Sequence, residues 1–218
     1  TPWVLQAQSE EKQKQNIGLL FDLNRMADER DQALAKISER QLGNGGFAWF
    51  PGGRDNWYIT QYLVEGFGHL DALGVENKSN DKISSITNRA VVYTDDRLVD
   101  HYNEIKKRVD RGDDKWENDH LSHIVIHYLY ARSFYKKIPQ NNKTAKVVDY
   151  FMGQVNEFWV DKNQYSQGML ALAMHRNGDK TVPGDIVKSL KERSLYNDEM
   201  GMYWKYNRGY YWYQLPIE

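Results

Sequence analysis

The chain has no cysteine, no long apolar run and almost no net charge over its 218 residues. The absence of cysteine excludes disulfides, cysteine-ligated metals and cysteine nucleophiles within this sequence. No apolar run approaches the roughly 18 residues of a membrane-spanning helix, so we expect no membrane span. The formal net charge of −1 carries no electrostatic footprint for nucleic acid, which is therefore not an expected partner.

Strand-like alternation of apolar and polar residues is also missing over any useful length, whereas helical spacing recurs along the chain. The sequence therefore predicts an all-α fold. Helices are expected at residues 9–27, 28–42, 57–73, 80–91, 98–109, 120–137, 144–159, 166–176 and 183–195. The fifth of them follows a break near Thr94, and a small Gly/aromatic hairpin is expected near the C-terminus, at 201–205 and 209–213.

One Gly/aromatic stretch, GNGGFAWFPGGRDNWYITQY (43–62), has a second copy near the C-terminus. Trp49 and Trp57 match Trp204 and Trp212 at one constant offset in the sequence. A weaker third copy lies between them, where IHYL resembles the TQYL of the first. A unit of helix, turn and helix cannot bury its apolar face alone, so such units must stack or close into a ring.

The four tryptophans Trp49, Trp57, Trp204 and Trp212 are candidate binding residues. Packing is the favoured interpretation, because the glycines permit tight turns and large aromatic rings usually lie in cores. Stacking on a ligand in a concave aromatic site is the alternative.

Three histidines in DHLSHIVIH (119–127) form a second candidate site. On a continuous helix, His120, His123 and His127 share one face, and zinc sites use neighbouring histidines of this kind. The glutamate of the HExxH motif is absent. Partly buried polar histidines on an inner helix are the favoured interpretation, so we expect neither a metal nor a cofactor.

A carboxylate beside an aromatic ring suggests an enzyme cleft. Asp55 stands next to Trp57, and Glu65 and His69 follow on the predicted helix. Glycan-processing enzymes need a second carboxylate or a base opposite the first. Asp55 immediately precedes the helix, so the expected role is to cap it.

The order of these motifs resembles the thioester-containing domain of the alpha-2-macroglobulin family, with the closest likeness to large bacterial members. The resemblance is carried by QLGNGGFAWFPGGRDNWYITQYLVEGFGHL (41–70), QGMLALAMHRNGD (167–179) and GYYWYQLPIE (209–218), and it covers essentially the whole chain. It implies an α/α toroid, a ring of inner and outer helices, which is expected to be incomplete here. Terpenoid cyclases and prenyltransferases share such turns.

The resemblance also implies a function for a larger parent protein. Family members are large secreted or periplasmic traps in which a protease cuts a bait region and an internal Cys–Gln thioester acylates the protease. The Cys-x-Glu-Gln segment of that chemistry is absent, and the chain starts at Thr1 and stops at Glu218. We therefore expect residues 1–218 to be a single domain, a non-enzymatic fragment of a longer multidomain chain.

Further expectations follow from the same resemblance. Some thioester proteins place a histidine near the thioester as a base or nucleophile, and His120, His123 and His127 are the candidates here. The expected partners are proteases, through the full-length protein, and other domains of the same chain. The expected location is periplasmic, cell-envelope or extracellular. The alternative is an α/α-toroid enzyme that acts on a glycan or an isoprenoid through the aromatic loops.

Overall fold

The structure is a computed structural model, which describes residues 23–74, 80–199 and 201–204. Within them the helices are α3 (Leu23–Arg40), α4 (Trp57–Ala72), α5 (Asn80–Asp110), α6 (His123–Arg132), α7 (Asn142–Phe158), the 3-10 turn η1 (Trp159–Asp161), α8 (Gln164–Arg176) and α9 (Thr181–Glu192). Two small antiparallel sheets pair β1 (Phe47–Ala48) with β2 (Asp55–Asn56) and β3 (Leu195–Asn197) with β4 (Gly201–Tyr203). The prediction of a mostly helical chain is confirmed.

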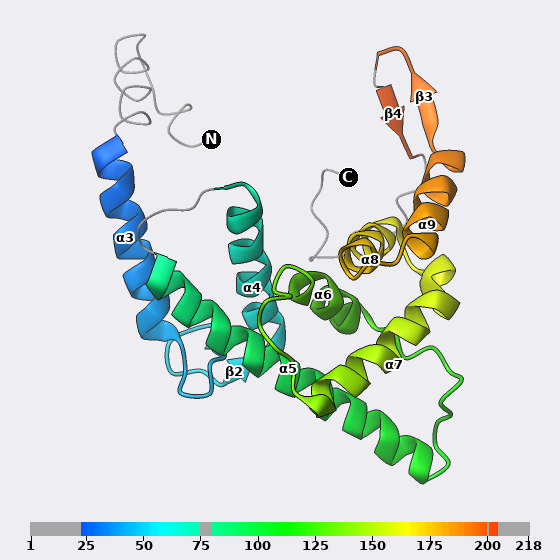
Figure 1. Ribbon diagram of the computed structural model, residues 1–218, viewed down its shortest axis with the longest axis horizontal. Coiled ribbons are helices and arrows are strands. Elements are labelled where there is room, and N and C mark those ends of the chain that lie inside the picture. The colour runs from blue at the N-terminus through cyan, green and yellow to red at the C-terminus, as the bar shows by residue number, and fades with distance from the viewer. Residues whose placement is uncertain (1–22, 75–79, 200, 205–218) are drawn as a thin grey trace.

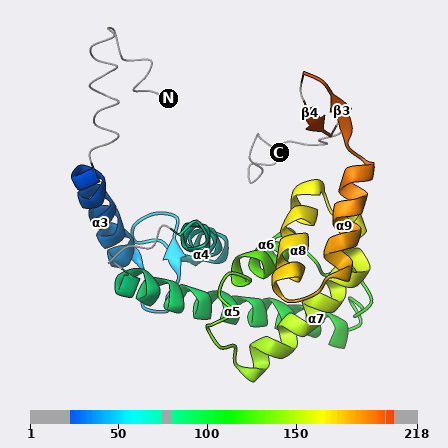
Figure 2. The ribbon, with the colours of Figure 1, turned by 45° about the horizontal axis from the view of Figure 1, so that its top comes forward.

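Consecutive helices alternate between two layers (Figures 1 and 2). The helices α4, α6 and α8 contact one another in series, and α3, α5 and α7 do the same. In Figure 2 the first set lies inside an arc that α3, α5, α7 and α9 follow on the outside. None of the helices in the described ranges is long and apolar enough to cross a membrane.

Asparagine side chains begin three of these helices. The Oδ1 atoms of Asn56, Asn141 and Asn163 accept hydrogen bonds from backbone N–H groups three residues later, at 3.0, 2.9 and 2.8 Å. Each bond satisfies a donor that the first helical turn leaves without a partner. The expected capping role of Asp55 is therefore wrong, since Asn56 caps α4 and Asp55 accepts instead from Tyr93 Oη at 2.6 Å.

The outer helix α5 is continuous, so the predicted break near Thr94 is wrong. Asp95 lies inside the helix and is buried. Its Oδ1 accepts from Tyr128 Oη at 2.6 Å and from Arg132 Nε at 2.9 Å, both on α6. These partners satisfy a carboxylate that in the sequence alone resembles a helix breaker. The sequence also predicted that one helix ends at residue 27 and that another begins at Asp28. This prediction is wrong, because α3 continues through Asp28.

Helix α6 is shorter than the predicted 120–137. It begins at His123, because hydrogen bonds fold the preceding residues into a turn, among them Leu121 N to Asp119 Oδ1 at 2.9 Å. It ends at Arg132, whose guanidinium donates to the carbonyl oxygens of Tyr135 at 2.5 Å and Ile138 at 2.7 Å. One side chain therefore closes the helix and shapes the turn after it.

The two copies of the Gly/aromatic turn share a backbone pairing. In the first, Leu42 N donates to Gly46 O at 2.9 Å. In the second copy, the residues that correspond to Leu42 and Gly46 are Asn197 and Gly201. These two are paired across the strands β3 and β4. The C-terminal hairpin exists, but β4 pairs with the preceding β3 and not with the predicted 209–213, which lies outside the described residues.

The main core lies between α5, α6, α7 and α8, around side chains such as Leu98, Phe151 and Leu170. A smaller core joins the first turn to α4 and α5 through Phe47, Val64 and others. Packing against both leaves one face of α4 partly uncovered, and the candidate site lies there.

Candidate functional site

Four polar and aromatic side chains form a stripe along the uncovered face of α4. Tyr58, Tyr62, Glu65 and His69 follow one another at spacings of four, three and four residues, which places them on one side of the helix. The opposite side is buried in the core. Trp49 stacks on Tyr58 with ring centroids 6.2 Å apart, and Tyr58 stacks on Tyr62 at 6.4 Å.

Glu65 is bound by two histidines, one on each carboxylate oxygen. His127 Nε2, on α6, lies 2.7 Å from Oε2, and His69 Nε2 lies 3.3 Å from Oε1. The amide nitrogen of Gln61 lies 3.2 Å from His127 Nδ1 and also donates to Ile124 O. Since that nitrogen can only donate, Nδ1 accepts and Nε2–H donates to Glu65.

The surroundings decide the protonation states of this cluster. Burial raises the pKa of Glu65, but the hydrogen bonds and charges of His127 and His69 lower it by more, so the carboxyl pKa lies below its ordinary value and the group is ionised. Burial, and repulsion from His127 when that ring is protonated, lower the pKa of His123 to about 4, so the His123 imidazole is neutral at neutral pH. Burial, followed by the charge of Glu65, raises the pKa of Tyr165 to about 12.

A pocket of about 390 Å³ opens beside Glu65. Its walls come from the three inner helices, from α9 and from the second Gly/aromatic turn. The lining residues are Glu65, His69, Tyr130, Gln164, Tyr165, Gly168, Met169, Leu172, Leu190 and Trp204. Most of this surface is apolar or aromatic, and among its polar groups Tyr130 Oη lies 3.2 Å from His69 Nε2.

The structure separates the predicted tryptophans. Trp204 lines the pocket, and its Nε1 donates to Leu190 O at 2.8 Å. Trp57 is half-buried against the main core, with its ring 5.7 Å from that of His101. Trp49 is 57% exposed and stacks on Tyr58. Trp212 lies outside the described residues.

The three histidines do not share one helix face, so that expectation is wrong. His120 precedes α6, and its Nδ1 lies 2.5 Å from Tyr150 Oη on α7. His123 and His127 lie on α6 with stacked rings 6.4 Å apart. Among the residues that the structure describes, no group of three or more histidine, cysteine, aspartate or glutamate side chains is arranged to hold a metal ion.

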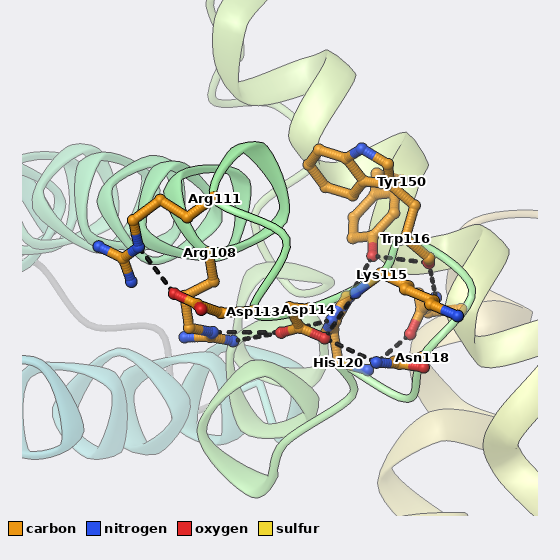
Figure 3. A network of polar contacts seen from close by, with 10 residues as sticks. Arg108, Arg111, Asp113, Asp114, Lys115, Trp116, Asn118, His120 and Tyr150 are labelled. Carbon is orange, nitrogen blue, oxygen red and sulfur yellow. Dashed lines mark hydrogen bonds and ion pairs between the residues drawn. The ribbon is translucent and has the colours of Figure 1, made fainter.

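His120 belongs to a polar network between α5 and α6 (Figure 3). Its Nε2 lies 3.2 Å from the carboxylate of Asp114, which also accepts from Arg108, Asn118 and Lys115 N. The bonds from Asn118, Lys115 and His120 hold the pKa of Asp114 well below its usual range. Since only 4% of the His120 side chain is exposed, the network ties a loop to its neighbouring helices and offers no access to a substrate.

The residue pairing at the centre of the site was not predicted. The sequence suggested a cleft of Asp55 with Glu65 and His69 only as an alternative to a capping role, and in the structure Asp55 bonds Tyr93. The partner of Glu65 is His127, on another helix. The spacing of the stripe on α4 was the available signal for Glu65 and His69, because it puts them with two tyrosines on one face.

Comparison of the chain with known protein families, with curated proteins and with solved structures found no match.

Proposed function

We propose that this chain is part of the α/α-toroid, thioester-containing domain of a bacterial alpha-2-macroglobulin-like protease trap. The observation that carries the proposal is the alternation of consecutive helices between an inner layer, α4, α6 and α8, and an outer layer, α3, α5 and α7. A ring of helical hairpins has this arrangement, and the described helices follow an open arc (Figure 2).

The repeated turn supports the same proposal. Its first copy joins α3 to α4, an outer helix to an inner one, and its second copy follows the outer helix α9. Leu42 with Gly46, and Asn197 with Gly201, are paired at equivalent positions. Turns that recur at equivalent places in a helical repeat are the joints of the repeat.

The chain acts in this proposal as a scaffold, because it has no cysteine with which to form a thioester. The reactive segment, where the parent has one, belongs to another part of the protein. Proteases are the partners of the whole protein, in the periplasm, at the cell envelope or outside the cell.

The coding sequence on either side of this segment tests the proposal first. We expect a very long reading frame with many β domains and a Cys-x-Glu-Gln segment some way before Thr1. A reading frame of ordinary enzyme length, without β domains, contradicts it.

A toroid enzyme is the second candidate, favoured by the Glu65–His127 pair beside an aromatic pocket. An imidazole held by a carboxylate can act as a general base. However, Glu65 is the one carboxylate among the described residues that line the pocket, and glycosidases generally use two. Release of reducing sugar from a polysaccharide that is lost in Glu65→Gln supports the enzyme, and equal release by both proteins contradicts it.

A further inference from the structure

We propose that the pocket between α4, α6 and α8 binds a primary alkylammonium group, as a lysine side chain carries it. The inference does not depend on the proposed function, because it uses only the residues that line the pocket.

The charge of the pocket favours a cation. Glu65 is ionised and its side chain is 16% exposed, so its charge is only partly screened by water. Each of its oxygens lies within hydrogen-bond distance of one histidine nitrogen. A carboxylate can accept about four hydrogen bonds in all, so Glu65 can accept further ones from a ligand. No lysine or arginine lies among the described residues that line the pocket.

A cationic side chain of the protein, Arg176, already packs on aromatic rings near the pocket. The guanidinium of Arg176 lies 3.8 Å from the ring centroid of Phe134 and 5.3 Å from that of Tyr130. It donates to Ser133 Oγ at 3.0 Å and is not one of the lining groups. It also interacts with the hydroxyl of Tyr130, a lining residue, but no ion pair joins it to Glu65 among the described residues.

The walls suit a charged head on a hydrocarbon arm. Tyr130, Tyr165 and Trp204 contribute aromatic rings to the lining of the same pocket, and the faces of such rings attract an ammonium group. Met169 and Leu172 supply apolar surface for methylene groups. The bond from the Trp204 indole to Leu190 O holds that ring in place.

A further acceptor in the wall requires a donor. The side-chain oxygen of Gln164 is buried and has no hydrogen-bond partner among the described residues. A buried acceptor without a donor destabilises the protein, and a ligand that supplies the donor removes this cost. An ammonium group brings three N–H donors and no acceptor, so it matches a pocket whose lining residues carry a carboxylate and an unpaired amide oxygen.

The size of the pocket limits the occupant to one side chain or one small amine. At about 390 Å³ it lies near the lower end of the roughly 300–1,000 Å³ range of small-ligand sites. Lysine in a polypeptide and a free alkylamine share the chemistry, and the experiment distinguishes the two sources.

The test is an NMR titration of the ¹⁵N-labelled chain with N-acetyl-lysine N-methylamide, followed at the indole N–H of Trp204. We expect saturable shifts at millimolar concentration, and at least roughly tenfold weaker binding in Glu65→Gln, since the substitution removes a charged hydrogen-bond acceptor. The neutral analogue N-acetyl-norleucine N-methylamide should shift the signal little. n-Butylammonium shows whether a free amine suffices or the peptide groups of lysine are also needed.

Two variants keep the test decisive. Glu104→Gln removes one exposed carboxylate on α5, away from the lining residues, and should bind like the unchanged protein. Trp204→Leu removes one aromatic wall and should weaken binding, read from the Gln164 side-chain amide signals, without changing the charge. Equal binding of the lysine and norleucine analogues, equal binding by Glu65→Gln, or no saturable shift with either amine overturns the proposal.

Discussion

His127 on α6 donates its Nε2–H to Glu65 on α4 across 2.7 Å, while its Nδ1 accepts from Gln61 at 3.2 Å. The imidazole therefore bridges two side chains of the neighbouring inner helix. Only 5% of the His127 side chain is exposed, so water cannot replace it. The contact joins α4 to α6, and it lowers the pKa of Glu65, the carboxyl group that lines the pocket.

Replacing His127 by leucine leaves a largely buried carboxylate and a buried amide without their partner. We expect His127→Leu to lower the free energy of unfolding by about 2–3 kcal/mol, measured by urea denaturation. His175→Leu is the matched control, because His175 is exposed on α8, and it should change stability by less than about 0.5 kcal/mol. Equal effects of the two substitutions contradict the bridging role.

Two glycines of α4 should respond oppositely to the same substitution. A Cβ at Gly68 lies 2.5 Å from Phe134 Cγ, whereas a Cβ at Gly66 meets nothing within 4 Å. We expect Gly68→Ala to destabilise the protein by about 1–3 kcal/mol through overpacking, and Gly66→Ala to stabilise it by about 0.5–1 kcal/mol through helix propensity. Thermal unfolding of both variants checks the close approach of α4 to Phe134, and a stabilised Gly68→Ala protein contradicts it.

His123, whose ring stacks on that of His127, should take up a proton only at acidic pH. His123 has its pKa lowered to about 4 from an unfolded value of 6.5, so the folded state binds fewer protons than the unfolded state between these values. Its contribution to stability is present above about pH 6.5 and is lost as the pH falls towards 4. NMR titration of the imidazole C–H signals, assigned with His123→Gln, measures this pKa directly. A midpoint near 6.5 contradicts the burial of this ring.

The network of Figure 3 should make the chain sensitive to acid. The folded pKa of Asp114 is depressed, so its contribution is present above the ordinary value of 3.8 and is lost as the pH falls below it. Asp114→Asn should therefore be less stable than the unchanged protein at pH 7, and the difference should shrink below about pH 4.

Asp113→Asn is the control for that prediction. Asp113 is exposed and pairs only with the exposed Arg111 among the described side chains, so its loss should matter little at any pH. A difference between Asp114→Asn and the unchanged protein that stays constant down to pH 3 argues against the depressed pKa.

Helices were predictable from the sequence wherever spacing and caps agreed. The pattern from residue 57 to 73 matches α4 within one residue, because apolar residues such as Ile59, Leu63 and Phe67 recur at helical spacing and pack into the smaller core. The pattern failed at Asp95, whose partners Tyr128 and Arg132 lie more than thirty residues away on α6. A polar residue inside a helix resembles a break until its distant partner is known.

The site was less predictable than the fold, because it depends on contacts between helices. The three histidines were grouped by their spacing, yet the chain turns just before His123, and this directs His120 to Tyr150. The sequence placed Glu65 correctly on the helix that begins at residue 57, but no neighbouring residue indicated that its partner is His127. Such pairings follow from how the layers pack, which periodicity along one helix does not contain.

The most direct measurement of the central claim uses the full-length protein with trypsin. After incubation and gel filtration, the account predicts that protease activity on a small peptide substrate elutes with the full-length protein, which has been cut at a bait region. Chemically inactivated trypsin, which cannot cut, should elute alone. Active trypsin that also elutes alone, or full-length protein that is degraded without retaining it, contradicts the claim that this arc of helices belongs to a protease trap.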